Sequence, residues 1–214
     1  MNSGKLKFDK VLCARCNNER SQVFDRSYDV FADYLHEKES LIVAAGYVRL
    51  TAIFGAGWRD RMPEVVKYFV KHVCCRMAED RVLIPKGVVD FLNGVRPDLP
   101  HLSMEMSINL SVHDLAKHEA DVHGVQGGSL WLGPQQAYLD PSGTSIDAVS
   151  SHLGVNCFFL GYVCDMRSPA GGMDFRGDCL VMPRYKPEGL QDVEIRDVCR
   201  DCNPKGPALA DADG

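Results

Sequence analysis

The stretch SMEMSINLSV, residues 103–112, alternates apolar and polar side chains and decides the fold class. The apolar side chains stand at every second position: Met104, Met106, Ile108, Leu110 and Val112. An alternation with a period of two is typical of a β-strand that buries one of its faces. We therefore expect a strand here, with its apolar face against a core.

The segments that follow this stretch also indicate strands. They are residues 128–139, with a kink at Gly133-Pro134, then residues 155–164 and residues 178–185. Each is apolar and is separated from the next by residues that favour turns. The second half of the chain is therefore expected to form a sheet.

The segments that precede the stretch indicate helices. Apolar residues recur at helical spacing in residues 21–38, from about Met62 onward, and in residues 85–93. The apolar run at residues 41–48 fits either a buried helix turn or a short strand. Helices first and strands after predict an α+β fold, in which N-terminal helices pack on a C-terminal antiparallel sheet.

These boundaries predict one domain. We expect a single α+β zinc-binding domain over residues 1–206, with a helical part at 21–95 and a sheet part at 100–186. The end of the chain is small, polar and broken by proline, so residues 207–214 are expected to form a disordered tail.

Composition limits the classes of function. The chain has 214 residues, is 45% hydrophobic and carries a formal net charge of -5, so any contact with nucleic acid must be local. It lacks an apolar run of about 18 residues and the apolar centre of a signal peptide. We expect a cytoplasmic protein without a membrane segment.

The nine cysteines are an odd number in a chain too large to need a disulfide scaffold, which favours a reducing compartment. Most stand in apolar segments and are expected to be small buried hydrophobic residues. These are Cys74, Cys75, Cys157, Cys164 and Cys179.

The other four cysteines form two CxxC pairs, one near each end of the printed sequence. Cys13 and Cys16 stand in CARCN, and Cys199 and Cys202 stand in CRDCN. Four thiolates complete a tetrahedral structural Zn²⁺ site, which contributes about 10 to 16 kcal/mol in finger peptides. We expect one zinc ion to join the termini. Two non-metal pairs, or a redox or histidine-completed site, are the alternatives.

The segment LCARCNNERSQVFDRSYDVFADYL, from Leu12 to Leu35, resembles the CxxCN zinc knuckle and following helix of HNH-type, treble-clef endonucleases. The resemblance implies that Cys13 and Cys16 bind zinc and that Asn17 stabilises the knuckle. That family places a catalytic Asp-His or His-His dipeptide upstream of the knuckle. No such dipeptide occurs in this sequence, so catalysis by the family mechanism is not expected.

Basic residues gather around the first CxxC pair. Lys10, Arg15, Arg20 and Arg26 are the candidate nucleic-acid-binding residues. They would give DNA or RNA a local basic patch. A solvated terminus whose cations balance the acidic residues near the other end explains the same charges.

His113, His118 and His123 stand five residues apart among acidic side chains. Five residues turn a helix by about 140°, so the three histidines would not share a helical face. A solvated loop or short helix is the simpler interpretation, and a metal-dependent hydrolase using these histidines is the third functional class.

Two functional hypotheses lead. The first is a zinc-stabilised, HNH-like protein that binds or processes nucleic acid, and the second is a protein-binding adaptor or inhibitor whose zinc is structural. Binding to DNA and RNA that weakens steeply with salt separates the first from the second. Whether the protein is an enzyme stays open.

Overall fold

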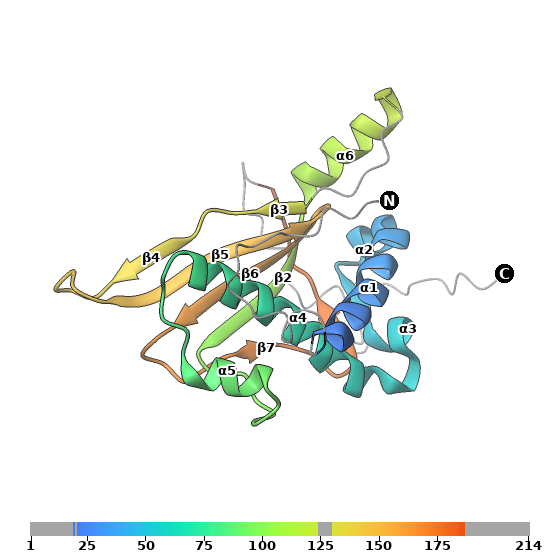
Figure 1. The fold of residues 1–214 in the computed structure, drawn as a ribbon. Coiled ribbons are helices and arrows are strands. Elements are labelled where there is room, and N and C mark those ends of the chain that lie inside the picture. Colours follow the sequence, from blue (N-terminus) through green and yellow to red (C-terminus); the bar gives the residue numbers. More distant parts are fainter. Residues whose placement is uncertain (1–18, 20, 124–129, 187–214) are drawn as a thin grey trace.

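The computed structural model describes residue 19 and residues 21–123 and 130–186. Within them, helices come first and a sheet follows, which confirms the α+β class (Figure 1). The first half contains α1 (Gln22–Glu37), α2 (Glu39–Ala45), β1 (Tyr47–Arg49), α3 (Leu50–Phe54), α4 (Trp58–Glu79) and α5 (Lys86–Leu92). The second half contains β2 (Leu102–Asn109), α6 (Leu110–His123), β3 (Leu130–Leu132), β4 (Gln136–Leu139), β5 (Ile146–Val155), β6 (Phe158–Asp165), β7 (Gly172–Met173), β8 (Cys179–Val181) and β9 (Arg184–Tyr185).

The main sheet has the strand order β3-β5-β6-β2-β7, with β4 also paired to β5 and β9 also paired to β2. The pairs β2–β6, β5–β6, β3–β5 and β4–β5 are antiparallel. β7 and β9, however, run parallel to β2, so the expectation of an antiparallel sheet is wrong at this edge. At this edge, β7 and β9 run alongside β2 in the same direction as β2. Between β7 and β9 it leaves the edge, and β8 pairs with β1.

The strand expected at residues 103–112 is confirmed as β2, but it is shorter than expected. It ends at Asn109, and Leu110 and Val112 belong to α6. The backbone N–H of Val112 donates to Oδ1 of Asn109 at 3.2 Å. Asparagine is a preferred residue for capping the N-terminus of a helix in this way. The cap at Asn109 therefore starts a helix, although the apolar-polar alternation of the sequence continues to Val112.

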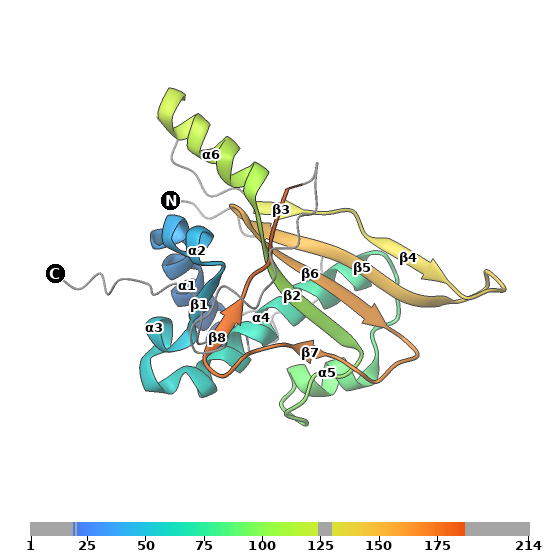
Figure 2. The same cartoon turned by 180° about the vertical axis from the view of Figure 1, so that it is seen from behind.

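The core lies between the helices and one face of the sheet. Figures 1 and 2 show α4 lying across that face, with α1 beside α4. The side chains of Val70 and Val73 from α4 are fully buried, as are Leu102 and Ile108 from β2. Leu160 of β6 is 1% exposed. We call this apolar region the helix–sheet core.

Two features of the fold place the candidate site. α6 continues directly from β2 and projects away from the sheet, so that its first turn stays beside the body (Figures 1 and 2). The β5–β6 hairpin turns at Asn156 and Cys157, between the paired residues Val155 and Phe158. That turn and the first turn of α6 therefore lie at the same end of the sheet, since Asn109 N–H donates to the carbonyl oxygen of Cys157.

Candidate metal centre

Glu39, His113 and Cys157 meet at this end of the sheet. One potential ligand atom from each lies within 4.8 Å of the others. Glu39 is the first residue of α2, His113 lies in the first turn of α6, and Cys157 is in the β5–β6 turn. The group therefore joins the helical layer, the projecting helix and the sheet.

The contacts inside the group are short. Nδ1 of His113 lies 3.0 Å from Oε1 of Glu39, and both side chains are 19% exposed. Cys157 is fully buried. The group thus has a buried sulfur on one side and a solvent-reachable carboxylate and imidazole on the other.

Local backbone conformation brings the three residues together. Lys38 has φ -105° and ψ 17°, which separates α1 from α2 and starts a new helix at Glu39. Asn156 has φ 53°, a left-handed conformation that asparagine tolerates better than most residues and that tight hairpin turns require. The turn at Asn156 directs the chain into Cys157, and the Asn109 cap begins the helix that carries His113.

A fourth polar side chain holds the carboxylate. Nδ2 of Asn156 donates a hydrogen bond of 2.9 Å to Oε2 of Glu39 and lies 3.1 Å from Nδ1 of His36. Oε1 of Glu39 faces His113 at the same time. Both carboxylate oxygens are therefore oriented by neighbours, which is how metal-binding carboxylates are commonly fixed.

The electrostatics of the group without a cation favour a neutral thiol. Burial, followed by the negative charge of Glu39, raises the pKa of Cys157 to about 12. A divalent cation would invert this balance, because a thiol that coordinates a metal is deprotonated outright. The same carboxylate that opposes the thiolate would then share its charge with the ion.

The donor set fits zinc. Zn²⁺ binds cysteine sulfur, histidine nitrogen and carboxylate oxygen, and mixed sites of three protein ligands leave the fourth position to another ligand. Harder cations such as Mg²⁺ and Ca²⁺ prefer oxygen ligands only, so the thiol of Cys157 selects against them. Glu39, His113 and Cys157 would hold the ion.

Most of the site residues predicted from the sequence are not among those that the structure describes. Cys13, Cys16, Cys199 and Cys202, as well as Lys10, Arg15 and Arg20, lie outside the described residues. The zinc knuckle joining the termini and the tail at 207–214 therefore stay predictions. Arg26 is described, and its side chain is exposed on α1.

The three histidines have different environments. His113 joins the group with Glu39 and Cys157, and His118 is exposed further along α6. The side chain of His123 lies outside the described residues. His113 and His118 thus do not share a site, as their five-residue spacing predicted. The spacing gave no sign that His113 has partners from other elements.

Cys157 was expected to be an ordinary buried cysteine. Its burial is confirmed, together with that of Cys74, Cys75, Cys164 and Cys179. Sequence reasoning missed its polar neighbours because Glu39 and His113 are 74 positions apart and Cys157 is further still. The one local signal was the Asn-Cys pair in an apolar segment, where asparagine suggests a turn.

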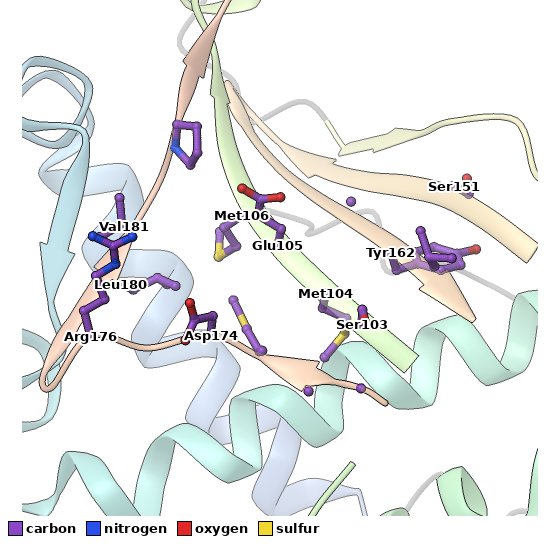
Figure 3. A pocket seen from close by; sticks show the side chains of 16 residues that line it. Ser103, Met104, Glu105, Met106, Ser151, Tyr162, Asp174, Arg176, Leu180 and Val181 are labelled. Atoms are coloured by element: carbon purple, nitrogen blue, oxygen red, sulfur yellow. The ribbon is translucent and has the colours of Figure 1, made fainter. Parts of the chain in front are cut away.

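A separate hollow of about 790 Å³ lies beside β2. Along β2 it falls between the part that pairs with β7 and the part that pairs with β9. Glu105 of β2, Asp174 and Arg176 are among the residues that line it (Figure 3). Within residues 21–123 and 130–186 no ion pair involves any of these three side chains. None of the three metal-centre residues lines the hollow.

Among the described helices, none is both long and apolar enough to cross a bilayer.

Comparison of the chain with protein-family models, with curated proteins and with solved structures gave no match.

Proposed function

We propose that this protein binds one zinc ion through Glu39, His113 and Cys157. The observation that carries the proposal is the convergence of a carboxylate, an imidazole and a thiol, with ligand atoms within 4.8 Å of one another. Three different donor types from three distant parts of the chain meet at one point. An ion there would fasten the start of α2 and the first turn of α6 to the β5–β6 turn.

The surroundings support a metal rather than a simple ion pair. A His–Glu ion pair needs neither a buried sulfur nor a second orienting hydrogen bond from Asn156 to the carboxylate. A zinc ligand set uses both, since the thiolate supplies charge and the amide fixes the carboxylate. The competing interpretation is a metal-free cluster in which the thiol of Cys157 and Glu39 share a hydrogen bond.

Metal analysis of the purified protein tests the proposal. The wild-type chain is expected to retain one more equivalent of zinc than Cys157→Ala, measured by mass spectrometry of the metal content after dialysis. Glu39→Gln and His113→Ala are expected to weaken the binding of the same equivalent of zinc. Cys75→Ser, which changes another buried cysteine, and His118→Ala, which changes an exposed histidine on the same helix, are the matched controls. Equal zinc in wild type and Cys157→Ala would refute the site.

The sequence also motivates a second zinc ion at Cys13, Cys16, Cys199 and Cys202. The two sites are separable, because Cys199→Ser/Cys202→Ser removes ligands of that site only. If both sites exist, the double variant and Cys157→Ala each lose one equivalent, and the triple variant loses two.

The hypothesis of nucleic-acid binding rests on the HNH resemblance and on Lys10, Arg15, Arg20 and Arg26. Its test is the salt dependence of binding to mixed DNA and RNA. A steep loss of affinity with added salt, reduced by Arg26→Ala, would support it. Absence of binding at low salt favours the adaptor hypothesis, in which a protein is the partner.

A further inference from the structure

Asn156 is a buried polar residue beside the centre. It is 7% exposed and has the positive φ of 53° described above. Its amide nitrogen donates to Oε2 of Glu39 at 2.9 Å and lies beside His36. The residue immediately after it is Cys157, so Asn156 is bonded to one metal-centre residue and hydrogen-bonded to another.

The carbonyl oxygen of the Asn156 side-chain amide differs from the nitrogen, because it makes no hydrogen bond to a described residue. Oδ1 of Asn156 is buried and has no hydrogen-bond partner among the residues that the structure describes. A buried polar atom without a partner loses the hydrogen bonds it would make to water, so native proteins rarely leave one. Exchanging the oxygen and nitrogen of the amide does not remove the problem, because an oxygen would then face the Glu39 carboxylate.

We propose that Oδ1 of Asn156 accepts a hydrogen bond from a water molecule that is the fourth, exchangeable ligand of the zinc ion. This inference rests on the proposed zinc site. A water on the ion would supply the donor that Oδ1 lacks. Asn156 is then a positioning residue: its N–H orients the Glu39 carboxylate, and its carbonyl oxygen orients the fourth ligand.

The ligand class follows from this pairing. The fourth position accepts small groups that bind zinc through oxygen and also carry a hydrogen-bond donor. A zinc ion with three protein ligands and one exchangeable ligand has the coordination of catalytic rather than closed structural sites. Glu39 and His113 are each 19% exposed, so the centre is not sealed from solvent.

Cobalt substitution makes the fourth position observable. The wild-type protein and Cys157→Ala are loaded with Co²⁺, and the difference between their visible spectra reports the centre. Acetohydroxamate, which carries an N–H donor, and its N-methyl derivative, which lacks that donor, are then titrated. Both probes are expected to change the wild-type spectrum, with acetohydroxamate binding about tenfold more tightly, as one hydrogen bond of about 1.4 kcal/mol predicts.

The decisive variant is Asn156→Gly. Glycine adopts positive φ without strain, so the β5–β6 turn is kept while the amide is removed. The expected result is weaker Co²⁺ binding, because Glu39 loses its amide donor, and at saturating Co²⁺ a ratio of the two hydroxamate affinities close to one. His36→Ala, which removes the other neighbour of the amide, is the control and is expected to keep the wild-type ratio.

The outcomes separate the two proposals. Co²⁺ spectra identical in wild type and Cys157→Ala would refute the zinc site itself. A Cys157-dependent spectrum that neither hydroxamate changes, or an affinity ratio that is the same in wild type and Asn156→Gly, would overturn the exchangeable ligand and leave the zinc site standing.

Discussion

The helix–sheet core and the metal centre are joined in one fold but are stabilised differently. The core is apolar and continuous: Val70, Val73, Leu102 and Leu160 are buried without polar partners. The metal centre is polar, and Glu39, His113 and Cys157 come from three separate elements. The difference shows that apolar burial holds the two layers together. The polar contacts at the end of the sheet instead fix the positions of three side chains that could bind a metal ion.

The largest expected effect comes from the helix–sheet core. Leu160→Ala removes a side chain that is 1% exposed and should lower the free energy of unfolding by about 2 to 5 kcal/mol, because the cavity left behind cannot collapse fully. Chemical denaturation measures it. Leu139→Ala, at a site 57% exposed, is the control and should change stability by less than about 0.5 kcal/mol. Comparable losses for the two variants would contradict the assigned core.

A pH effect should follow from His72, a buried histidine on α4. Burial, and then the positive charge of Lys71, lower its pKa from 6.5 to about 4. The unfolded chain therefore binds a proton that the folded chain does not. The stability that depends on a neutral His72 is fully present above pH about 6.5. As the pH falls toward about 4, the free energy of unfolding decreases by roughly 3 kcal/mol.

Denaturation of wild type and His72→Gln at pH 7 and at pH 4 measures this effect. The variant should lose less stability on acidification than wild type does. His118→Gln, at an exposed position, is expected to match wild type at both values. An equal acid-induced loss in wild type and His72→Gln would show that other groups cause it.

Zinc should stabilise the metal centre by an amount set by mass action. At a free zinc concentration one hundred times the dissociation constant, the stabilisation is about 2.7 kcal/mol. In a Cys199→Ser/Cys202→Ser background, the increase in melting temperature on adding zinc should disappear with Cys157→Ala and remain with Leu160→Ala, since Leu160→Ala changes only the core. A zinc-induced increase that survives in Cys157→Ala would point to another site.

The smallest effect is expected at the cap of α6. Asn109→Ala removes the acceptor of the Val112 N–H and should cost about 1 kcal/mol. Amide hydrogen exchange in α6 should become faster, and zinc affinity should fall because His113 lies in that first turn. Asn109→Ser, which keeps a capping oxygen, should restore most of the protection, whereas an equal loss in both variants would assign the effect to the contact with Tyr185.

Much of the fold could be predicted from local patterns. The helices at 22–37 and 86–92, the strand from 102 and the kink at Gly133-Pro134 between β3 and β4 all follow from periodicity or from turn residues. β5 was missed because IDAVSSHLGV has only a weak alternation. Residues 41–48, for which a buried helix turn and a short strand were both considered, contain one of each: most of α2, followed by the start of β1.

The candidate site could not be predicted in the same way. His113 was singled out with His118 and His123 because of sequence spacing, and Cys157 was set aside because of its apolar neighbours. Their actual partner is Glu39, which no local pattern connects to either. Conversely, the CxxC pairs and the basic residues, which carry the strongest local signals, lie outside the described residues apart from Arg26.

The sequence by itself determined the α+β class, the helices at 22–37 and 86–92, and the alternating strand that faces the core. These features depend on the period of side chains along the backbone, which is a local property. Only the tertiary structure decided that β7 and β9 run parallel to β2, and that Glu39, His113, Asn156 and Cys157 share one site. Contacts between distant residues depend on how complete layers pack, and no pattern within a short segment encodes that.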